Sequence, residues 1–211
     1  MSLFITLEGG EGSGKTSVIK VLEEKIKKEL NLDVLSTREP GGIEISEQIR
    51  SVLLNKKNIN MDKKTEALLF AAARRQHLVE KIIPHLNKKN SMVICDRFVD
   101  SSLVYQGMGR DIGFDNVFNI NQFAIEGHMP NLTFLLDLDP KVGLERINKN
   151  SLREINRLDL EKIEFHQKVR EGYLFLANKF SDRIKIIDAS ETIQQIADDI
   201  FNIIKKYLIG N

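Results

Sequence analysis

Short runs of apolar residues alternate along the chain with longer stretches in which apolar residues recur every three or four positions. Strands that alternate with helical segments are typical of βαβ units around a parallel sheet. Buried strands are predicted at residues 4–7, 34–36, 92–95, 133–136 and 184–187. The hydrophobic pattern therefore predicts an α/β fold built on a five-stranded parallel sheet.

Between these runs, the spacing of apolar residues fits helices that bury one face. Two such faces are formed by Ile19, Leu22, Ile26 and Leu30 and by Ile45, Ile49, Val52 and Leu53. A long helix is expected at residues 63–86, with a kink or break at Pro84. Further helices are expected at residues 117–126, 141–148, 160–179 and 193–207.

The segment 148–157 is rich in charge and poor in apolar residues. This composition predicts a mobile excursion and not a domain boundary. No repeat and no Gly/Ser linker divides the chain. With 211 residues the chain is long enough for one sizeable α/β domain and too short for two comfortable ones. A single domain over residues 1–211 is therefore predicted.

Charge and cysteine content narrow the classes of function. The chain carries 31 Lys and Arg against 30 Asp and Glu, so no overall field attracts nucleic acid or an anionic membrane. The longest apolar run, residues 67–73, is far below the roughly 20 residues of a membrane-spanning helix. Residues 1–4 do not resemble the start of a secretory signal, and Cys95 stands alone. We expect a reducing cytoplasm and neither a nucleic-acid nor a membrane partner.

A glycine-rich stretch, GGEGSGKT at residues 9–16, lies between the first predicted strand and the first predicted helix. It fits the pattern G-x-x-x-x-G-K-[ST], whose backbone N–H groups cradle phosphate oxygens at a helix N-terminus. Lys15 would reach the β- and γ-phosphates, and the Thr16 hydroxyl would hold Mg²⁺. The predicted ATP-binding set here comprises Gly9, Gly10, Glu11, Gly12, Ser13, Gly14, Lys15, Thr16 and Ser17.

Several classes of protein use such a loop. A signalling GTPase would need a guanine-reading N-K-x-D after a strand, and the sequence has none. A motor or transport ATPase needs larger partner surfaces than 211 residues offer, although a regulatory ATPase subunit stays open. A small-molecule kinase needs a second site that holds an acceptor in line with the γ-phosphate.

Arginines stand where such an acceptor site would form. Arg38 follows the second predicted strand and Arg97 the third, and open α/β sheets bind ligands at the carboxyl ends of their strands. Any one of them alone fits a solvated surface charge, but as a set, with Arg50 on the next helix, they suit bidentate binding of phosphate. Asp96, at the end of the third strand, is suited to hold a Mg²⁺-bound water.

Four further stretches stand out: REPGG at 38–42, FAAARRQH at 70–77, DRFVDSSLVYQG at 96–107 and NRLD at 156–159. Together with the phosphate loop they resemble the thymidylate kinases of the bacterial type, enzymes that convert dTMP to dTDP. The resemblance covers nearly the whole chain, and the first and third stretches are specific to that family. It implies a three-layer P-loop nucleoside-monophosphate-kinase fold, ATP and dTMP as substrates, Mg²⁺ as cofactor and a homodimer.

The resemblance also implies roles for individual residues. Phe70 would stack on thymine and Arg74 would donate to its O4, although by residue type alone Phe70 fits a core aromatic equally well. Ser102 and Gln106 would bind the base edge, and Tyr105 would crowd the sugar 2′ position. The other implied substrate-binding residues are Glu11 at the sugar 3′-hydroxyl and Arg38, Glu39, Arg50 and Arg97 around the acceptor phosphate.

One position separates two types of thymidylate kinase. The eukaryotic type has an arginine after the loop carboxylate, whereas this chain has Gly12 there. The bacterial type instead places arginine in a lid over ATP, which corresponds here to residues 148–157. Arg153 is the first and Arg157 the second candidate to contact the transferred phosphoryl group, and Arg146 is a candidate for an ATP contact.

The implied chemistry needs cations and no catalytic base. A phosphate monoester has a second pKa of about 6, so the dTMP oxygen is already anionic at neutral pH. Positioning and neutralisation of charge then drive the transfer, and the expected catalytic residues are Lys15, Arg97, Arg153 and Arg157. Two alternatives stay open: a kinase of another nucleoside monophosphate or of a deoxynucleoside, and a P-loop regulatory ATPase.

Overall fold

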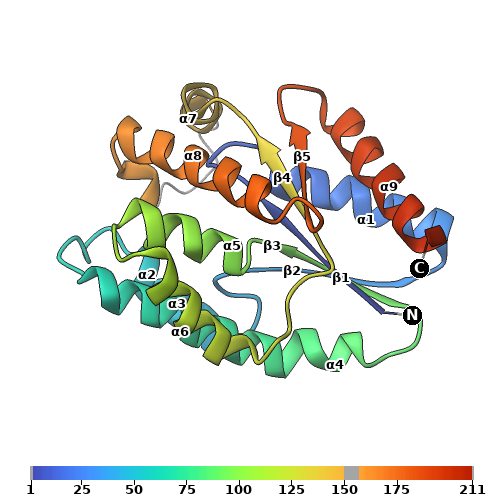
Figure 1. The fold of residues 1–211 in the computed structure, drawn as a ribbon, viewed down its shortest axis with the longest axis horizontal. Helices are drawn as coiled ribbons and strands as arrows, with labels where there is room; N and C mark the ends of the chain where they lie inside the picture. Colours follow the sequence, from blue (N-terminus) through green and yellow to red (C-terminus); the bar gives the residue numbers. More distant parts are fainter. Residues whose placement is uncertain (1, 150–156, 211) are drawn as a thin grey trace.

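The computed structural model describes residues 2–149 and 157–210. Its centre is a parallel five-stranded sheet in the order β2-β3-β1-β4-β5 (Figure 1). The strands are β1 (Ser2–Glu8), β2 (Asp33–Arg38), β3 (Ser91–Asp96), β4 (Leu132–Asp137) and β5 (Ile184–Asp188). Each strand contains one of the five predicted apolar runs, so the predicted α/β fold is confirmed.

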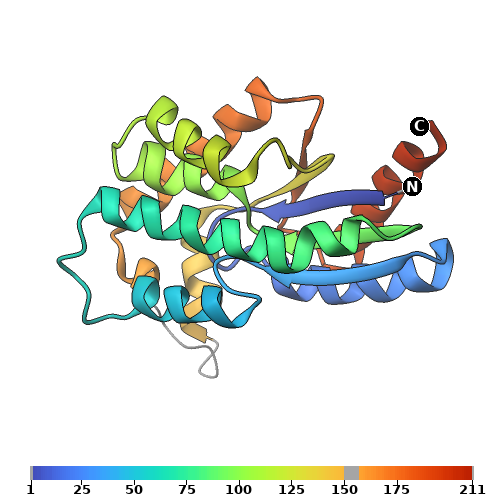
Figure 2. The same ribbon diagram turned by 90° about the horizontal axis from the view of Figure 1, so that it is seen from below.

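Helices cover both faces of the sheet and give it three layers (Figures 1 and 2). On one face, α1 (Lys15–Leu30) packs against α9 (Ile193–Gly210), and both bury the apolar stripes that predicted them. The other face carries α2 (Glu44–Leu54), α3 (Lys63–His77), α4 (Ile83–Leu86), α5 (Val99–Ser102), α6 (Phe114–Ile125) and α8 (Ile163–Lys179). A further helix, α7 (Pro140–Lys149), follows β4 and contacts α8.

The register of the sheet gathers the predicted site at one edge. Asp96 at the end of β3 pairs with Leu7 of β1 on one side and with Arg38 of β2 on the other. Because the strands are parallel, the segments that follow all three strands emerge at this edge. The phosphate loop and two of the predicted arginines are thereby brought together.

The chain is helical over residues 99–109, which the hydrophobic pattern did not predict. A short α5 continues into the π-helical segment η2 (Leu103–Gly109). Residues 98–107 are all buried, so this helix has no polar face from which a period of 3.6 residues could be recognised. This helical stretch carries Ser102 and Gln106, which were expected to bind the base edge, and Tyr105, which was expected to crowd the sugar.

Pro84 does not break the long helix of residues 63–86. Instead, α3 passes into the π-helical segment η1 (Leu78–Ile82) and then into α4. Ile83 N–H donates to the Leu78 carbonyl, five residues back. The wider turn accommodates a proline, whose ring and missing N–H do not fit the usual i→i−4 ladder.

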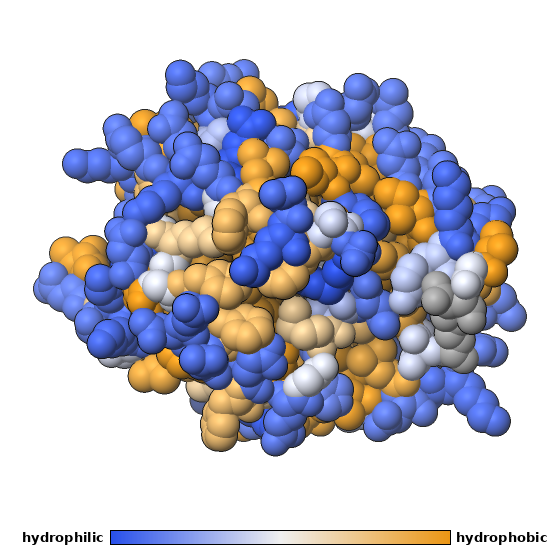
Figure 3. Space-filling view, in the orientation of Figure 1, coloured by the Kyte–Doolittle hydropathy of each residue, from blue (hydrophilic) through white to orange (hydrophobic). Residues whose placement is uncertain are grey.

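Large apolar side chains are exposed on the surface of α3 and α6, where Figure 3 shows apolar side chains together. Leu68 of α3 is 55% exposed and Phe123 of α6 is 87% exposed. The predicted lid, residues 148–157, lies mostly outside the described residues, and Arg153 lies outside them. Among the residues that are described, no helix is both long and apolar enough to cross a membrane.

Candidate active site

The loop between β1 and α1 has a shape that only glycine permits at two positions. Gly12 has a φ of 72°, and a Cβ there would lie 2.1 Å from the carbonyl oxygen of Gly143 in α7. Gly9 has a φ of 141°, and a Cβ there would lie 2.5 Å from the Leu136 carbonyl oxygen. The loop therefore lies tightly against β4 and α7, with the N-terminus of α1 directly behind it.

Lys15 lies inside this loop. Its Nζ donates to the carbonyl oxygens of Gly9 and Gly10 at 3.1 and 2.9 Å, and to Ser13 Oγ at 3.2 Å. Burial, followed by the charge of Arg97, lowers the pKa of Lys15 from 10.5 to about 8. The ammonium group is thus held by uncharged acceptors, and a bound phosphate would give it an ionic partner.

Thr16 and Asp96 meet at the entrance to the loop. Thr16 Oγ1 donates to Asp96 Oδ2 at 2.9 Å, and both residues line the same cleft as the loop. Hydroxyl and carboxylate oxygens beside a phosphate site are the ligands that Mg²⁺ prefers. The two residues predicted to hold the metal therefore fit it by their chemistry and by their common position.

Arg97 connects the phosphate loop with the segment that follows β3. Its Nη2 donates to Glu11 Oε1 at 2.7 Å, and its Nη1 donates to the Gly9 carbonyl, Ser101 Oγ and Tyr173 Oη at 3.0 to 3.2 Å. Its backbone φ is 70°, the left-handed region that non-glycine residues seldom adopt. Such a strained arginine, fixed by four partners, is typical of a binding site.

A cleft of about 1050 Å³ extends from the phosphate loop along the carboxyl ends of β1, β2 and β3. This is the upper end of the size of small-molecule sites and is sufficient for a sizeable ligand. Of the predicted ATP-binding residues, residues 11–17 and Arg146 line it. Gly9 and Gly10 do not line this cleft, but their carbonyl oxygens hold Lys15.

The other predicted phosphate-binding arginines also line the cleft. Arg38 pairs with Glu47 at 2.9 Å, and Arg50 Nη1 donates to the Pro40 carbonyl at 2.8 Å. Burial, together with the charges of Arg38 and Arg97, lowers the pKa of Arg50. An arginine whose pKa is lowered by neighbouring arginines lies in a positive site that an anion would stabilise.

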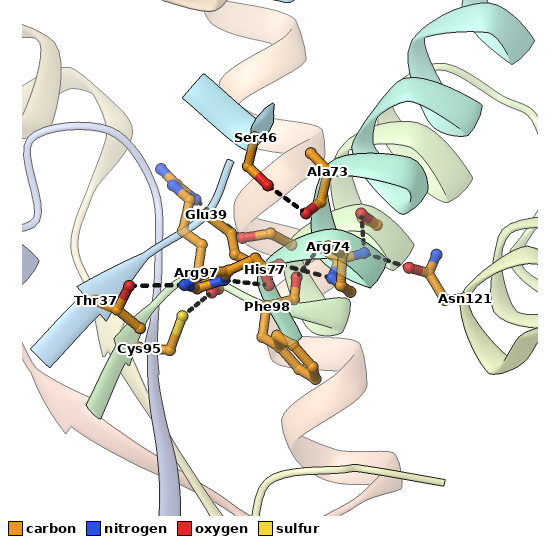
Figure 4. A network of polar contacts seen from close by, with 12 residues as sticks. Thr37, Glu39, Ser46, Ala73, Arg74, His77, Cys95, Arg97, Phe98 and Asn121 are labelled. Carbon is orange, nitrogen blue, oxygen red and sulfur yellow. Dashed lines mark hydrogen bonds and ion pairs between the residues drawn. The ribbon is translucent and has the colours of Figure 1, made fainter. Parts of the chain in front are cut away.

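Arg74 lies at the far end of the cleft from the loop, in the polar network of Figure 4. Its Nε donates to Glu39 Oε2 at 2.7 Å, and its Nη2 donates to the Phe98 carbonyl at 2.9 Å. Its Nη1 donates to Ser102 Oγ at 3.0 Å and also to Asn121 Oδ1. The cleft at this end is lined by the predicted base-binding residues Phe70, Arg74, Ser102 and Gln106, and by Tyr105, which was predicted to crowd the sugar.

Glu39 was expected to support the acceptor phosphate, and it lines the cleft with a side chain that is largely buried. Besides Arg74, it contacts His77 Nδ1 at 3.1 Å, and His77 Nε2 contacts Thr37 Oγ1 at 2.7 Å (Figure 4). Glu39, His77 and Cys95 are close enough to share a metal ion. Their polar atoms already contact protein groups, including the Arg97 carbonyl, which accepts from Cys95 Sγ at 3.1 Å. We therefore interpret this cluster as a structural network.

Arg157 is not brought to the cleft. Its Nη2 donates to Glu66 Oε2 at 2.5 Å, and its Nε donates to the Leu53 carbonyl at 3.0 Å. Arg157 is buried and does not line the cleft in this structure. Arg153, the first candidate for the lid cation, lies outside the described residues.

The sequence reasoning did not identify Glu8, the last residue of β1, which holds the segment that follows β3 in place. Glu8 accepts from Phe98 N–H at 2.7 Å, from Ser101 Oγ at 2.5 Å and from Tyr173 Oη at 2.9 Å. Burial, and then the charge of Asp100, raises the pKa of Glu8 from 4.5 to about 7. A carboxylate that ends an apolar strand is the hint that the sequence offers of this role.

Known proteins similar to this chain have a common description. Residues 7–200 match the family model for thymidylate kinase. A thymidylate kinase of Clostridium novyi (strain NT) is 57% identical over 202 residues, which cover 96% of this chain and 98% of that protein. One from Geobacillus sp. (strain WCH70) is 58% identical over 193 residues, covering 92% and 91% of the two chains.

A solved structure is also similar to this fold. It is the crystal structure of thymidylate kinase from Ehrlichia chaffeensis, with a TM-score of 0.77 and 32% identity. The likeness covers 97% of this chain and 98% of the other. Because the family model, the relatives and the fold agree over nearly the whole length, the chain belongs to the thymidylate kinase family.

Proposed function

We propose that the protein transfers the γ-phosphoryl group of ATP to dTMP, giving ADP and dTDP. The observation that carries this proposal is Arg97, which contacts the phosphate loop through Gly9 and Glu11 and lines the cleft that continues toward Phe70 and Arg74. A residue in that position can contact a donor phosphate and an acceptor phosphate at once. The family of the chain supports the same reaction.

The loop and its lysine bind the phosphates of ATP. Backbone N–H groups at the N-terminus of α1 attract the phosphate oxygens, and Lys15 pairs with them. Arg38, Arg50 and Arg97 bind the acceptor phosphate at the other side of the cleft. Since that phosphate is ionised at neutral pH, these residues orient it and neutralise its charge, and no residue needs to remove a proton.

Mg²⁺ would be held by Thr16 and, through a water, by Asp96. When bound, it supplies positive charge to the phosphates of ATP. The Thr16 hydroxyl and the Asp96 carboxylate, which are hydrogen-bonded to one another, are pre-positioned as its ligands. Their chemistry suits a small, hard cation with oxygen ligands.

The far end of the cleft selects the nucleoside. Phe70 stacks on the thymine ring, Arg74 donates to its O4, and Ser102 and Gln106 contact its edge. Tyr105 crowds the sugar 2′ position, and Glu11 contacts the sugar 3′-hydroxyl. These assignments are supported by the cleft lining, which contains all the residues named.

The remaining features concern the lid and the assembly. The lid, residues 148–157 of a single kinase domain, carries Arg153 onto the transferred phosphoryl group. Two copies of the chain pair through α3 and α6, whose exposed Leu68 and Phe123 offer an apolar surface. The enzyme works in the cytoplasm. Arg146 binds on the ATP side of the cleft, where it donates to the Ala189 carbonyl at 3.2 Å.

An ADP-release assay with a panel of acceptors tests the proposal: dTMP, dUMP, dCMP, UMP, GMP, AMP and thymidine. We expect dTMP to give the highest turnover and thymidine none, because thymidine has no phosphate for Arg38, Arg50 and Arg97 to bind and orient. Equal turnover of all monophosphates would disprove the substrate assignment. ADP release that needs no acceptor would instead indicate a regulatory ATPase.

A further inference from the structure

Glu66 lies outside the cleft but contacts a residue that lines it. It belongs to the first turn of α3, its side chain is 1% exposed, and its Oε1 accepts from Gln106 Nε2 at 2.8 Å. Two guanidinium groups contact the same carboxylate, Arg157 at 2.5 Å and Arg110 at 3.4 Å. Gln106 lines the cleft, whereas Glu66 does not.

This contact determines which way the Gln106 amide points. A carboxylate between guanidinium groups only accepts hydrogen bonds, so the amide nitrogen of Gln106 must face Glu66. Within residues 2–149 and 157–210, no group donates to Gln106 Oε1, and this oxygen is not one of the buried unpaired atoms. The oxygen is therefore the end of the amide that faces the cleft.

Arg74 supplies the opposite polarity. Its hydrogen bonds to Glu39, Ser102, Asn121 and the Phe98 carbonyl use four of its five N–H groups. One Nη2 N–H has no partner in the described part of the chain. Beside the Ser102 hydroxyl, this end of the cleft therefore offers a donor from the arginine and an acceptor from the glutamine amide.

A pyrimidine whose ring N–H stands beside a carbonyl matches this pair. Thymine offers N3–H to an acceptor and O4 to a donor. Cytosine is reversed at both positions, because its N3 accepts and its 4-amino group donates. Two like groups would then face each other at each contact, which is a means of rejecting the wrong base.

We propose that Glu66 is a positioning residue for base selection, which locks the Gln106 amide with its oxygen toward the cleft. The proposal rests on dTMP being the acceptor. A flipped amide would suit cytosine N3, but its oxygen would then face the Glu66 carboxylate, and two acceptors would oppose each other. Glu66 thus prevents Gln106 from adapting to cytosine.

The test compares kcat/KM for dTMP and dCMP in the wild-type enzyme and in Glu66→Gln. An amide at position 66 can donate as well as accept, so Gln106 becomes free to flip. We expect the ratio of kcat/KM for dTMP over dCMP to fall at least about tenfold, with kcat/KM for dCMP rising. General damage to the fold would lower both values and would not raise the second.

Glu161→Gln is the matched control. Glu161 accepts from Arg110 Nη2 at 2.6 Å, so this variant removes a carboxylate from the same ionic cluster without touching Gln106. It should keep the wild-type ratio. A loss of the ratio in this control equal to that in Glu66→Gln would overturn the lock, because the effect would then follow charge alone.

The double variant Glu66→Gln/Gln106→Glu exchanges the two side chains and keeps their charge and volume. The carboxylate now at position 106 can only accept, so the preference for dTMP over dCMP should persist. This variant decides the question if Glu66→Gln fails to fold. Loss of the preference here, or a wild-type ratio in a folded Glu66→Gln, would overturn the lock. Equal use of dTMP and dCMP by the wild type would overturn the proposed substrate as well.

Discussion

Arg97 donates to Glu11 across 2.7 Å, and this ion pair joins the end of β3 to the phosphate loop. The Tyr105 hydroxyl donates to the same carboxylate oxygen at 3.1 Å, and its ring lies 5.0 Å from the Arg97 guanidinium carbon. The loop carboxylate therefore positions the arginine that we assign to the acceptor phosphate. A residue that a generic phosphate loop leaves variable has a definite task here.

Glu11→Gln should weaken the positioning of Arg97. The variant replaces a hydrogen bond between charged groups, of the kind that contributes about 1.5–3 kcal/mol, with a weaker one to a neutral amide. We expect kcat/KM for dTMP at saturating ATP to fall about tenfold or more. Steady-state kinetics would measure this, and Tyr105→Phe, which removes only the second donor to the same oxygen, should cost less. Wild-type kinetics in Glu11→Gln would mean that Arg97 is positioned by its other partners.

Asp96→Asn should raise the concentration of Mg²⁺ that activity requires. Thr16 keeps its hydrogen bond to an amide oxygen, so the loop stays in place, but the anionic charge that attracts the cation is lost. We expect the Mg²⁺ concentration for half-maximal activity to rise about tenfold or more. A titration of activity with Mg²⁺ after removal of free metal by a chelator measures it. An unchanged titration curve would remove Asp96 from the metal site.

The site residues that could be predicted from the sequence are those carried by short local patterns. Lys15 and Thr16 belong to one continuous loop, and Arg38 and Arg97 follow predicted strands, so sequence order alone brought them to one edge of the sheet. The parallel sheet could be predicted because each strand is a buried apolar run with turns on either side. The resemblance to a family then located Phe70 and Gln106.

Contacts between distant segments could not be predicted. The partners Glu66 and Gln106 are forty positions apart, and nothing in the residues around Glu66 marks its side chain as buried. Arg157 was expected to contact the transferred phosphoryl group because the family resemblance places it in the lid, but its guanidinium contacts Glu66 in this structure. Which cation meets which anion depends on how helices pack on the sheet, and a linear pattern does not contain that information.

The lowered pKa of Lys15 predicts that ATP binding takes up a proton in alkaline solution. With a pKa of about 8, Lys15 is largely charged at pH 7 and largely neutral at pH 9, and bound phosphate favours the charged form. We expect uptake of about one proton per ATP at pH 9, almost none at pH 7, and affinity that falls about tenfold per pH unit above 8. Calorimetry in two buffers with different ionisation enthalpies measures the uptake. Lys15→Met should abolish it, and equal uptake at both pH values would contradict the prediction.

The raised pKa of Glu8 predicts a stability that declines toward alkaline pH. The folded protein binds the Glu8 proton up to about pH 7, whereas an unfolded chain releases it near 4.5, so this group's contribution is lost as pH rises between these values. Glu8→Gln mimics the protonated form and should remove this loss. We expect the melting temperature of the variant, relative to wild type, to be at least about 3 °C higher at pH 8 than at pH 5. A constant difference across that range would mean that Glu8 stays ionised in the fold.

Arg157 and Arg153 should separate into a structural and a catalytic arginine. Arg157→Ala leaves the buried Glu66 with one guanidinium partner fewer, which costs about 1–3 kcal/mol of unfolding free energy and lowers the melting temperature by several degrees. Arg153→Ala should leave the melting temperature unchanged and lower kcat more than about tenfold, with little change in dTMP affinity. Thermal unfolding and kinetics on both variants measure this. The reverse pattern, an unaltered melting temperature and a large loss of kcat in Arg157→Ala alone, would assign the transferred phosphoryl group to Arg157, which would then have to leave Glu66 during each turnover.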